Sequence, residues 1–146
     1  EEARINRRFD WKITATDIST TVLEKARAGV YPEASLMRTP AVLSNRYFTP
    51  TGTAMERRIL PDLRKRIDFE VLNLFEIPRS FPDRFELILC RNVMIYFDRP
   101  TREQLIRSLT QRLLPGGTLF VGHSESLGGI QHELKMIKPA IYRKDS

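Results

Sequence analysis

The chain has 146 residues, the length of one domain, and 41% of them are hydrophobic and 29% charged. These fractions are those of ordinary globular proteins, and they exclude a disordered, collagen-like or coiled-coil chain. Lysine and arginine outnumber aspartate and glutamate by 24 to 18, and this net charge of +6 favours an acidic partner or a nucleic acid.

The chain opens on the polar stretch EEARINRRFD, and its first residue is Glu1 rather than methionine. We therefore expect the sequence to be cut from a longer protein. The next segment, WKITATD, alternates and is rich in β-branched residues, which predicts a strand from Trp11 to about Asp17.

A helix is predicted directly after this strand, from Thr20 to about Ala28. Ser19 is a good N-cap residue, the apolar residues of TTVLEKARA recur at helical spacing, and Gly29 is placed to end the helix. A strand that leads into a helix in this way is typical of an α/β fold.

Residues 31–48 have an irregular pattern, because Pro32 and Pro40 interrupt two short helical pieces, PEASLM and PAVLSNRYF. The next stretch, RYFTPTGTAMERRI, predicts two short strands around Pro50-Thr51-Gly52. We interpret it as a hairpin inserted at about residues 46–59, a small β-subdomain on a main sheet.

A basic cluster, Arg57-Arg58 with Arg64-Lys65-Arg66, lies at the end of this hairpin and beyond it. It can be a solvated face, a surface for an acidic protein or a contact with nucleic acid. No aromatic residues interleave it, as they would on a surface that stacks bases.

The main sheet is predicted to resume with FEVLN, Phe69–Asn73, and to continue with FELILCR, Phe85–Arg91. The second run is almost continuously apolar, which indicates a central strand buried on both faces. It contains the only cysteine, Cys90, which we expect to be a buried thiol in a reducing compartment. The sequence has neither an apolar run near the roughly 18 residues of a membrane span nor a signal peptide, so a cytoplasmic location is expected.

Asp98 and Pro100 are expected to open a helix that Pro115-Gly116-Gly117 closes. Its apolar stripe consists of Leu105, Ile106, Leu109, Leu113 and Leu114. TLFVGH then predicts a strand, and HELKMIKPAIYRKD predicts two strands that break near Pro139 and form an antiparallel edge.

In open α/β sheets ligands bind outside the carboxyl ends of the strands, which here carry Asp17, Asn73, Arg91-Asn92 and His123-Ser124-Glu125. Asp17 can accept hydrogen bonds from both hydroxyls of a ribose, or it can simply cap a helix or close a turn. Asn73 can contact an adenine edge, or it can belong to a plain strand-end turn.

Arg91 directly follows a strand predicted to be buried, so it must find solvent, an anion or a partner carboxylate. His123-Ser124-Glu125 resembles part of a hydrolase triad, but the sequence has no GxSxG nucleophile turn. It also has no glycine-rich phosphate loop, and two histidines with one cysteine do not support a metal site.

Several segments of the chain resemble the CheR family of chemotaxis receptor glutamate methyltransferases in order and spacing. These segments are ATDIST with VLEKARAGVY, DFEVLNLFE, FELILCRNVMIYFD and LLPGGTLFVGHSES. The resemblance covers nearly the whole chain. It implies a class I S-adenosylmethionine-dependent methyltransferase fold, which is Rossmann-like. It also implies methylation of glutamates on the cytoplasmic helices of chemoreceptors, with γ-glutamyl methyl esters and S-adenosylhomocysteine as products.

The same resemblance assigns roles to single residues. Asp17 matches the acid that binds the ribose, and Asn73 and Leu74 match the adenine contacts. Arg91 and Asn92 match the cofactor and active-site loop, and Tyr96 matches the tyrosine beside the transferred methyl. We expect Arg91 to orient the incoming carboxylate and Tyr96 to pack near the methyl group.

The chain departs from the family at its beginning. It lacks the family's first strand and the acidic glycine motif resembling GEEPYS. In the family a helix comes after this motif, and residues 1–10 resemble the tail of that helix. In the usual strand order, 3-2-1-4-5-7-6, strand 1 is central. We therefore expect that strands 2 and 4 pair directly, that a second chain fills the gap, or that upstream sequence supplies the strand.

Two further expectations concern partners. The inserted hairpin resembles the β-subdomain with which some family members dock a receptor-tail pentapeptide, but the loop TPTGTAME is short and lacks a second glycine. The basic cluster can instead meet an acidic receptor surface. Residues 1–146 are thus interpreted as a partial methyltransferase domain, with a non-catalytic signalling module as the alternative and a nucleic-acid methyltransferase as a third reading.

Overall fold

The structure, a computed structural model, describes residues 10–53, 55–78, 80–81 and 84–145. The chain divides into two compact units, Glu1–Asn73 and Leu74–Ser146. Among the described residues, none of the helices combines the length and the apolar character that crossing a bilayer requires. The helix tail was predicted for residues 1–10, and residues 1–9 of it lie outside the described residues.

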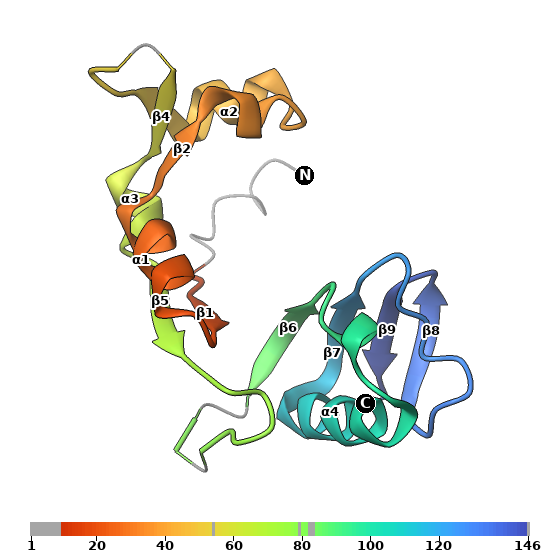
Figure 1. The fold of residues 1–146 in the computed structure, drawn as a ribbon. Helices are drawn as coiled ribbons and strands as arrows, with labels where there is room; N and C mark the ends of the chain where they lie inside the picture. The colour runs from red at the N-terminus through yellow and green to blue at the C-terminus, as the bar shows by residue number, and fades with distance from the viewer. Residues whose placement is uncertain (1–9, 54, 79, 82–83, 146) are drawn as a thin grey trace. The chain divides into compact units, whose positions relative to one another are not determined.

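The first unit contains two small sheets. Its elements are β1 (Ile13–Asp17), α1 (Thr20–Ala28), β2 (Val30–Pro32), the 3-10 turn η2 (Glu33–Leu36), α2 (Ala41–Tyr47), β3 (Phe48–Pro50), β4 (Glu56–Ile59), α3 (Pro61–Arg64) and β5 (Ile67–Val71). β1 and β5 pair in parallel, and β2, β4 and β3 form an antiparallel sheet in that order. Within this unit α1 leads from β1 to the three-stranded sheet, and α3 leads back from it to β5 (Figure 1).

Helix α1 has the predicted bounds, and its two caps explain them. The Ser19 hydroxyl accepts a hydrogen bond from the Val22 amide at 3.3 Å. Gly29 has a φ of 64°, and its amide donates to the carbonyls of Lys25 and Ala26. A Cβ on Gly29 would lie 2.7 Å from Ile59 Cγ2, so both backbone conformation and close packing require glycine here.

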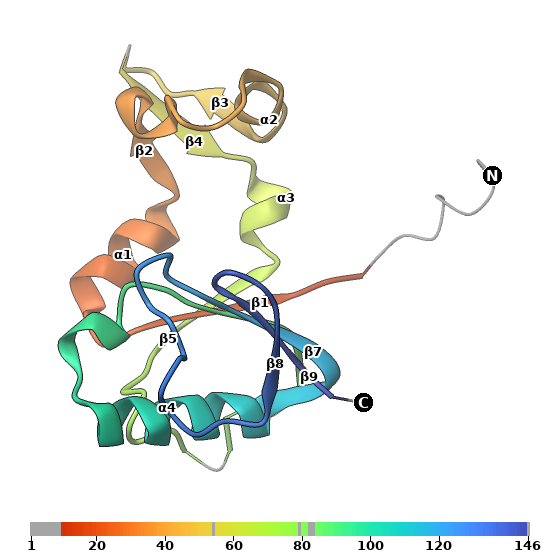
Figure 2. The same cartoon turned by 90° about the vertical axis from the view of Figure 1, so that its right-hand side faces the viewer.

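The inserted hairpin is present as β3 and β4, and the two predicted helical pieces before it are η2 and α2. The sequence interpretation missed β2, which pairs with β4 from Val30 opposite Arg58 to Pro32 opposite Glu56. Three residues ending in proline are too short to show alternation, and proline is tolerated because β2 is an edge strand. In the first unit these three strands lie beside α2 (Figure 2).

The second unit is a four-stranded sheet covered by one long helix. Its elements are β6 (Phe85–Cys90), the 3-10 turn η3 (Met94–Tyr96), α4 (Arg99–Arg112), β7 (Leu113–Val121), β8 (Leu134–Lys138) and β9 (Ile141–Lys144). The strand order is β6-β7-β9-β8, with β6 and β7 parallel and the other pairs antiparallel. The two predicted tail strands are therefore confirmed as β8 and β9.

The core of the second unit lies between α4 and the sheet. Its fully buried side chains include Leu105 and Ile106 of α4 and Leu119 of β7, each 0% exposed. Leu127 and Tyr142 close the same core from the loop after β7 and from β9. The Leu127 amide donates to the Tyr142 hydroxyl at 3.2 Å, so this loop is held to the sheet.

The predicted C-terminal bound of α4 is wrong. The helix ends at Arg112, and Leu113 has extended angles and begins β7, where it pairs with Phe85. Leu113 stays in the predicted core because it is 2% exposed from its position on the strand. The Pro115-Gly116-Gly117 segment thus lies inside β7, where Gly116 has a φ of 75° and the register with β6 shifts.

Two other predictions about the sheet need correction. β5 is Ile67–Val71 rather than 69–73, so Asn73 follows the strand instead of ending it. β6 is not buried on both faces, since Leu87 is 50% and Leu89 67% exposed while Cys90 and Ile88 pack into the core. Successive strand residues face opposite sides, and in the described residues only the side toward α4 is covered.

The strand neighbours agree with the order implied by the resemblance. β5-β1 reproduces the pair 3-2, and β6-β7-β9-β8 reproduces 4-5-7-6. The two runs form separate sheets in the described residues, one in each unit.

Candidate functional site

Asp17 is the last residue of β1 and is half-buried. Its Oδ1 atom accepts a hydrogen bond from the Ser19 amide at 2.8 Å, which fixes the carboxylate at the N-terminal end of α1. A carboxylate has acceptor capacity for about four hydrogen bonds. Asp17 can therefore close the turn and still receive hydroxyl groups from a ligand, so the two sequence interpretations of this residue are compatible.

Asn73 lies close to Asp17 along the backbone of the first unit. The Leu72 amide donates to the Asp17 carbonyl at 3.0 Å, which extends the pairing of β5 and β1 by one bond and places Asn73 directly after it. Leu72 is buried at 8% exposure and anchors this segment. The structure thus brings two of the predicted cofactor residues to one pair of strand ends.

Leu74, the other predicted adenine contact, begins the second unit and packs, half-buried, against its hydrophobic core. The neighbouring Phe75 meets Phe97 edge to face with ring centroids 5.1 Å apart. Leu74 therefore has a packing role that is visible without any ligand.

Arg91, Asn92 and Tyr96 form a short loop at the carboxyl end of β6, which we call the 91–96 loop. Arg91 and Asn92 are exposed, and Tyr96 is 80% exposed at the end of the 3-10 turn η3. Asn92 has a φ of 60°, in the left-handed region that asparagine tolerates better than most residues. The loop presents a cation and an aromatic ring to solvent, as a site for a carboxylate would.

Glu125 lies in the turn after β7 and contacts this loop, and it is 4% exposed. Its Oε2 atom accepts hydrogen bonds from the amides of Asn92 and Gly122, and its Oε1 atom accepts one from Met94, each at 2.7 Å. Burial by itself would raise the pKa of this carboxyl, but the amides of Asn92, Gly122, Met94 and Ile95 together outweigh it, and the pKa is lowered. Glu125 is therefore a charged acceptor at the ends of two strands.

Gly122 makes this arrangement possible by its small size. A Cβ placed on it would lie 2.5 Å from Glu125 Oε2 and 2.8 Å from Asn92 Oδ1. The Glu125 amide also donates to the Gly122 carbonyl at 2.9 Å, which closes a tight turn after β7.

Sequence reasoning named Glu125 as a strand-end residue but gave it no role. The available signal was the spacing: a glycine directly after a strand and a glutamate three residues later, in GHSE. Because its partners are backbone amides, two of them more than thirty residues away in the chain, side-chain chemistry alone did not reveal them.

Cys90, the last residue of β6, is a buried thiol as predicted, at 6% exposure. Burial, together with the nearby negative charge of Glu125, raises its pKa to about 11. Cys90 therefore stays protonated and unreactive near neutral pH.

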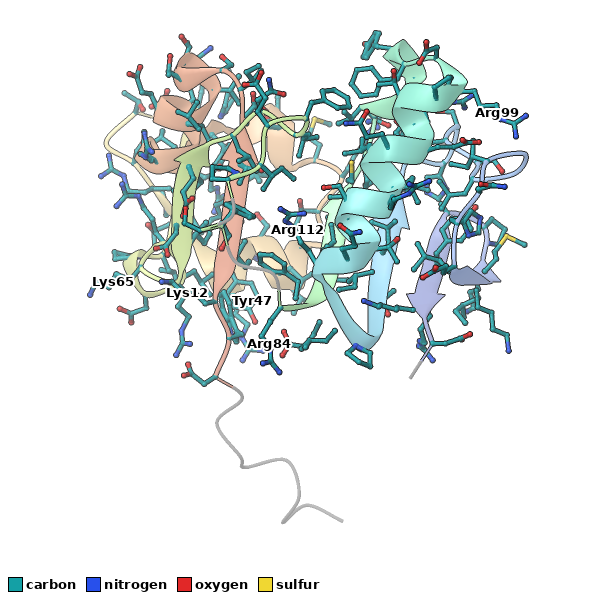
Figure 3. The ribbon with its side chains drawn as sticks, turned by 90° about the horizontal axis from the view of Figure 1, so that it is seen from below. Lys12, Tyr47, Lys65, Arg84, Arg99 and Arg112 are labelled. Carbon is teal, nitrogen blue, oxygen red and sulfur yellow. The ribbon has the colours of Figure 1, made fainter. Side chains whose placement is uncertain are left out.

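A shallow hollow in the first unit lies away from these strand ends. It is lined by Asp10, Trp11, Lys12, Lys65 and Arg66. Lys12 and Lys65 mark this end of the first unit (Figure 3). The residues of the hollow come directly before β1 and β5, at the amino ends of these strands, so the hollow is no part of the site at their carboxyl ends.

The chain matches one protein-family model, "CheR methyltransferase, SAM binding domain", over residues 1–143. It is 41% identical over 133 residues to "Chemotaxis protein methyltransferase 2" of Pseudomonas aeruginosa, which covers 90% of this chain and 48% of that protein. It is 39% identical over 145 residues to "Chemotaxis protein methyltransferase" of Borreliella burgdorferi, which covers 99% and 50%. The chain thus spans about half the length of the curated relatives it matches.

Among solved structures, the chain resembles the N-methyltransferase NodS from Bradyrhizobium japonicum with a TM-score of 0.52. The match covers 92% of this chain and 74% of that chain at 14% identity. At this identity the likeness shows the fold alone, and it supports the Rossmann-like methyltransferase fold that the strand order already indicated.

Proposed function

Because this chain belongs to the CheR methyltransferase family, we propose that its protein transfers a methyl group from S-adenosylmethionine to glutamate side chains of chemoreceptors. The product is a γ-glutamyl methyl ester, and the setting is the cytoplasmic part of the chemotaxis pathway. The observation that carries the proposal is the family match over residues 1–143, which includes every strand end described above.

The residues present fit the cofactor. The half-buried carboxylate of Asp17 is oriented by Ser19 and retains acceptor capacity for the two ribose hydroxyls. Asn73 and Leu74 are assigned to the adenine, and Asn92 to the cofactor side of the 91–96 loop. When bound, S-adenosylmethionine supplies a methyl group on a positively charged sulfur.

The methyl-accepting substrate requires little acid–base chemistry from the protein. A glutamate carboxylate is ionised near neutral pH, so no general base is needed. The exposed guanidinium of Arg91 can bind this carboxylate with two hydrogen bonds and set its direction of approach. We assign Tyr96, which is 80% exposed in the same loop, to pack next to the reacting groups and exclude water. Orientation and desolvation would then supply most of the rate.

The test is methyl transfer by the protein at its full natural length. Purified cytoplasmic fragments of chemoreceptors are incubated with methyl-labelled S-adenosylmethionine, and base treatment then releases methyl esters as labelled methanol. Label that is base-labile and absent from receptors with glutamine at the target glutamates supports the proposal. Receptor binding without any methylation would overturn it and identify the non-catalytic signalling module instead.

Arg91→Ala tests the role of this arginine. We expect kcat/KM for the receptor to fall by roughly a hundredfold, because a misplaced reacting group can cost about that factor. Arg143→Ala, an exposed arginine on β9, is the matched control and should keep full activity. Unchanged turnover in Arg91→Ala would show that another group orients the carboxylate.

A further inference from the structure

We propose that Glu125 is a positioning residue for methyl transfer: its carboxylate holds the 91–96 loop through backbone amides and so fixes Arg91 and Tyr96. The inference rests on the proposed function, and it adds a residue to which the resemblance assigned no role.

The geometry of the contact supports this role. Glu125 follows β7, its amide partners Asn92 and Met94 follow β6, and the two strands are adjacent and parallel. One carboxylate therefore joins the carboxyl ends of two neighbouring strands. The bonds of 2.7 Å are at the short end for N–H donors to an ionised acceptor, which are roughly twice as strong as neutral hydrogen bonds.

The burial of this charge needs an explanation that packing does not give. A buried carboxylate is costly unless its lone pairs are satisfied. Among the described residues Glu125 has no cation within 4.0 Å, and backbone amides satisfy it instead. Most of those amides belong to the 91–96 loop, so the Glu125 carboxylate fixes the backbone of this loop.

Glu125 stabilises the left-handed backbone conformation of Asn92. A non-glycine residue with positive φ persists only where its surroundings determine it, and here the Asn92 amide is tied to Glu125 while Gly122 leaves room for its side-chain oxygen. Arg91 precedes this residue and Tyr96 follows it by four positions. Release of the Asn92 amide would therefore move both exposed side chains.

The variants separate charge from shape. Glu125→Gln keeps the shape, but its NH₂ group would face amide donors and cannot accept from them. Glu125→Asp keeps the charge on a shorter side chain. We expect kcat to fall at least about tenfold in Glu125→Gln, with a smaller change in KM for the receptor, and Glu125→Asp to recover part of kcat, because loop position sets orientation more than binding. Glu133→Gln, an exposed glutamate of the same unit, should be unchanged.

Amide hydrogen exchange gives a readout that does not depend on activity. The Asn92 and Met94 amides of the wild type should be protected, and Glu125→Gln should expose them while the amides of the α4 core keep their protection. If Glu125→Gln fails to fold, Gly122→Ala keeps the carboxylate but displaces it, and it should show the same two effects.

The outcomes are distinguishable from those of the proposed function. A wild type that methylates receptors, with Glu125→Gln equally active, overturns the positioning role and leaves the proposed function standing. A wild type that transfers no methyl group overturns the proposed function and with it a role of Glu125 in methyl transfer, and amide exchange then decides only whether Glu125 holds the 91–96 loop. Unprotected Asn92 and Met94 amides in the wild type overturn the role of Glu125 whether or not the protein transfers methyl groups.

Discussion

Asp17 and Glu125 are both carboxylates at strand ends, but their surroundings give them different tasks. Asp17 is half-buried and accepts the Ser19 amide through one oxygen, which leaves acceptor capacity toward a ligand. Glu125 is almost fully buried, and both of its oxygens accept backbone amides. Asp17 is thus suited to bind, and Glu125 is suited to hold protein.

Asp17→Asn should weaken binding of S-adenosylhomocysteine by about tenfold or more, since hydrogen bonds to charged groups contribute about 1.5–3 kcal/mol. Calorimetric titration of the full-length protein measures this directly. Asp62→Asn, at an exposed position on α3, is the control and should bind normally. Equal affinities for Asp17→Asn and the wild type would remove Asp17 from the cofactor site.

Cys90 should resist alkylation in the folded protein. With its pKa raised to about 11, the thiolate is about a thousandth of the population at pH 8, and the thiol is also buried. Iodoacetamide should label it slowly in buffer and rapidly in denaturant, as followed by mass spectrometry. Fast labelling of folded protein would show that the carboxyl end of β6 opens readily.

At the level of single elements, local signals worked where the structure depends on neighbours in the chain. The bounds of α1 follow from Ser19 and Gly29, which cap it with their own atoms. The end of α4 was mispredicted because Leu113 satisfies the same apolar pattern from a strand. β2 and the exposed face of β6 escaped prediction because they depend on which strands and helices pack against them.

A residue of strand β9 holds the C-terminal end of helix α4. Lys144 of β9 donates from Nζ to the carbonyls of Thr110 and Leu113 at 2.9 and 2.8 Å. These carbonyls lie at the helix end, where a cation is also favoured by the helix dipole. Arg99 and Arg112 mark the two ends of this helix in Figure 3.

Lys144→Met should lower the free energy of unfolding by about 1–3 kcal/mol, the cost of leaving buried acceptors without a donor. Urea unfolding followed by circular dichroism measures it. Lys135→Met, at an exposed position on β8, provides the comparison and should change stability little. A loss no larger than that of the control would mean that water replaces the ammonium group.

For the molecule as a whole, the strand order was predicted from the resemblance and the organisation around Glu125 was not. The order needs only the sequence of elements along the chain, which apolar patterns reveal. The contacts of Glu125 join residues about thirty positions apart, and they use amides that every sequence has. The positions of the candidate residues after the strands were therefore predictable, whereas the contacts of Glu125 with the 91–96 loop required the structure.

The fold should lose stability in acid. The pKa values of Asp98, Glu103 and Glu125 are lowered, chiefly by the hydrogen bond from Thr101, by the hydrogen bond from Arg99 and by backbone amides respectively. A lowered folded-state pKa contributes stability above the unfolded value, and that contribution is lost as pH falls through the folded value. Melting temperatures should hold from pH 7 to about 5 and decline below the ordinary carboxyl range near pH 4.

Glu125→Gln provides the check on this acid sensitivity. The variant lacks one of the three titrating groups, so its melting temperature should depend less on pH below about 4 than that of the wild type. Parallel curves for the two proteins would show that folding does not lower the pKa of Glu125.

The position of β9 between β7 and β8 has a consequence for synthesis on the ribosome. β6, α4 and β7 leave the exit tunnel first, but their sheet lacks the strand that supplies Tyr142 and Lys144 until β9 emerges last. At roughly 5–20 residues per second, the nascent chain carries an unfinished apolar sheet for a few seconds. Stalling of synthesis before residue 141 should therefore leave the second unit without β9 and sensitive to proteases.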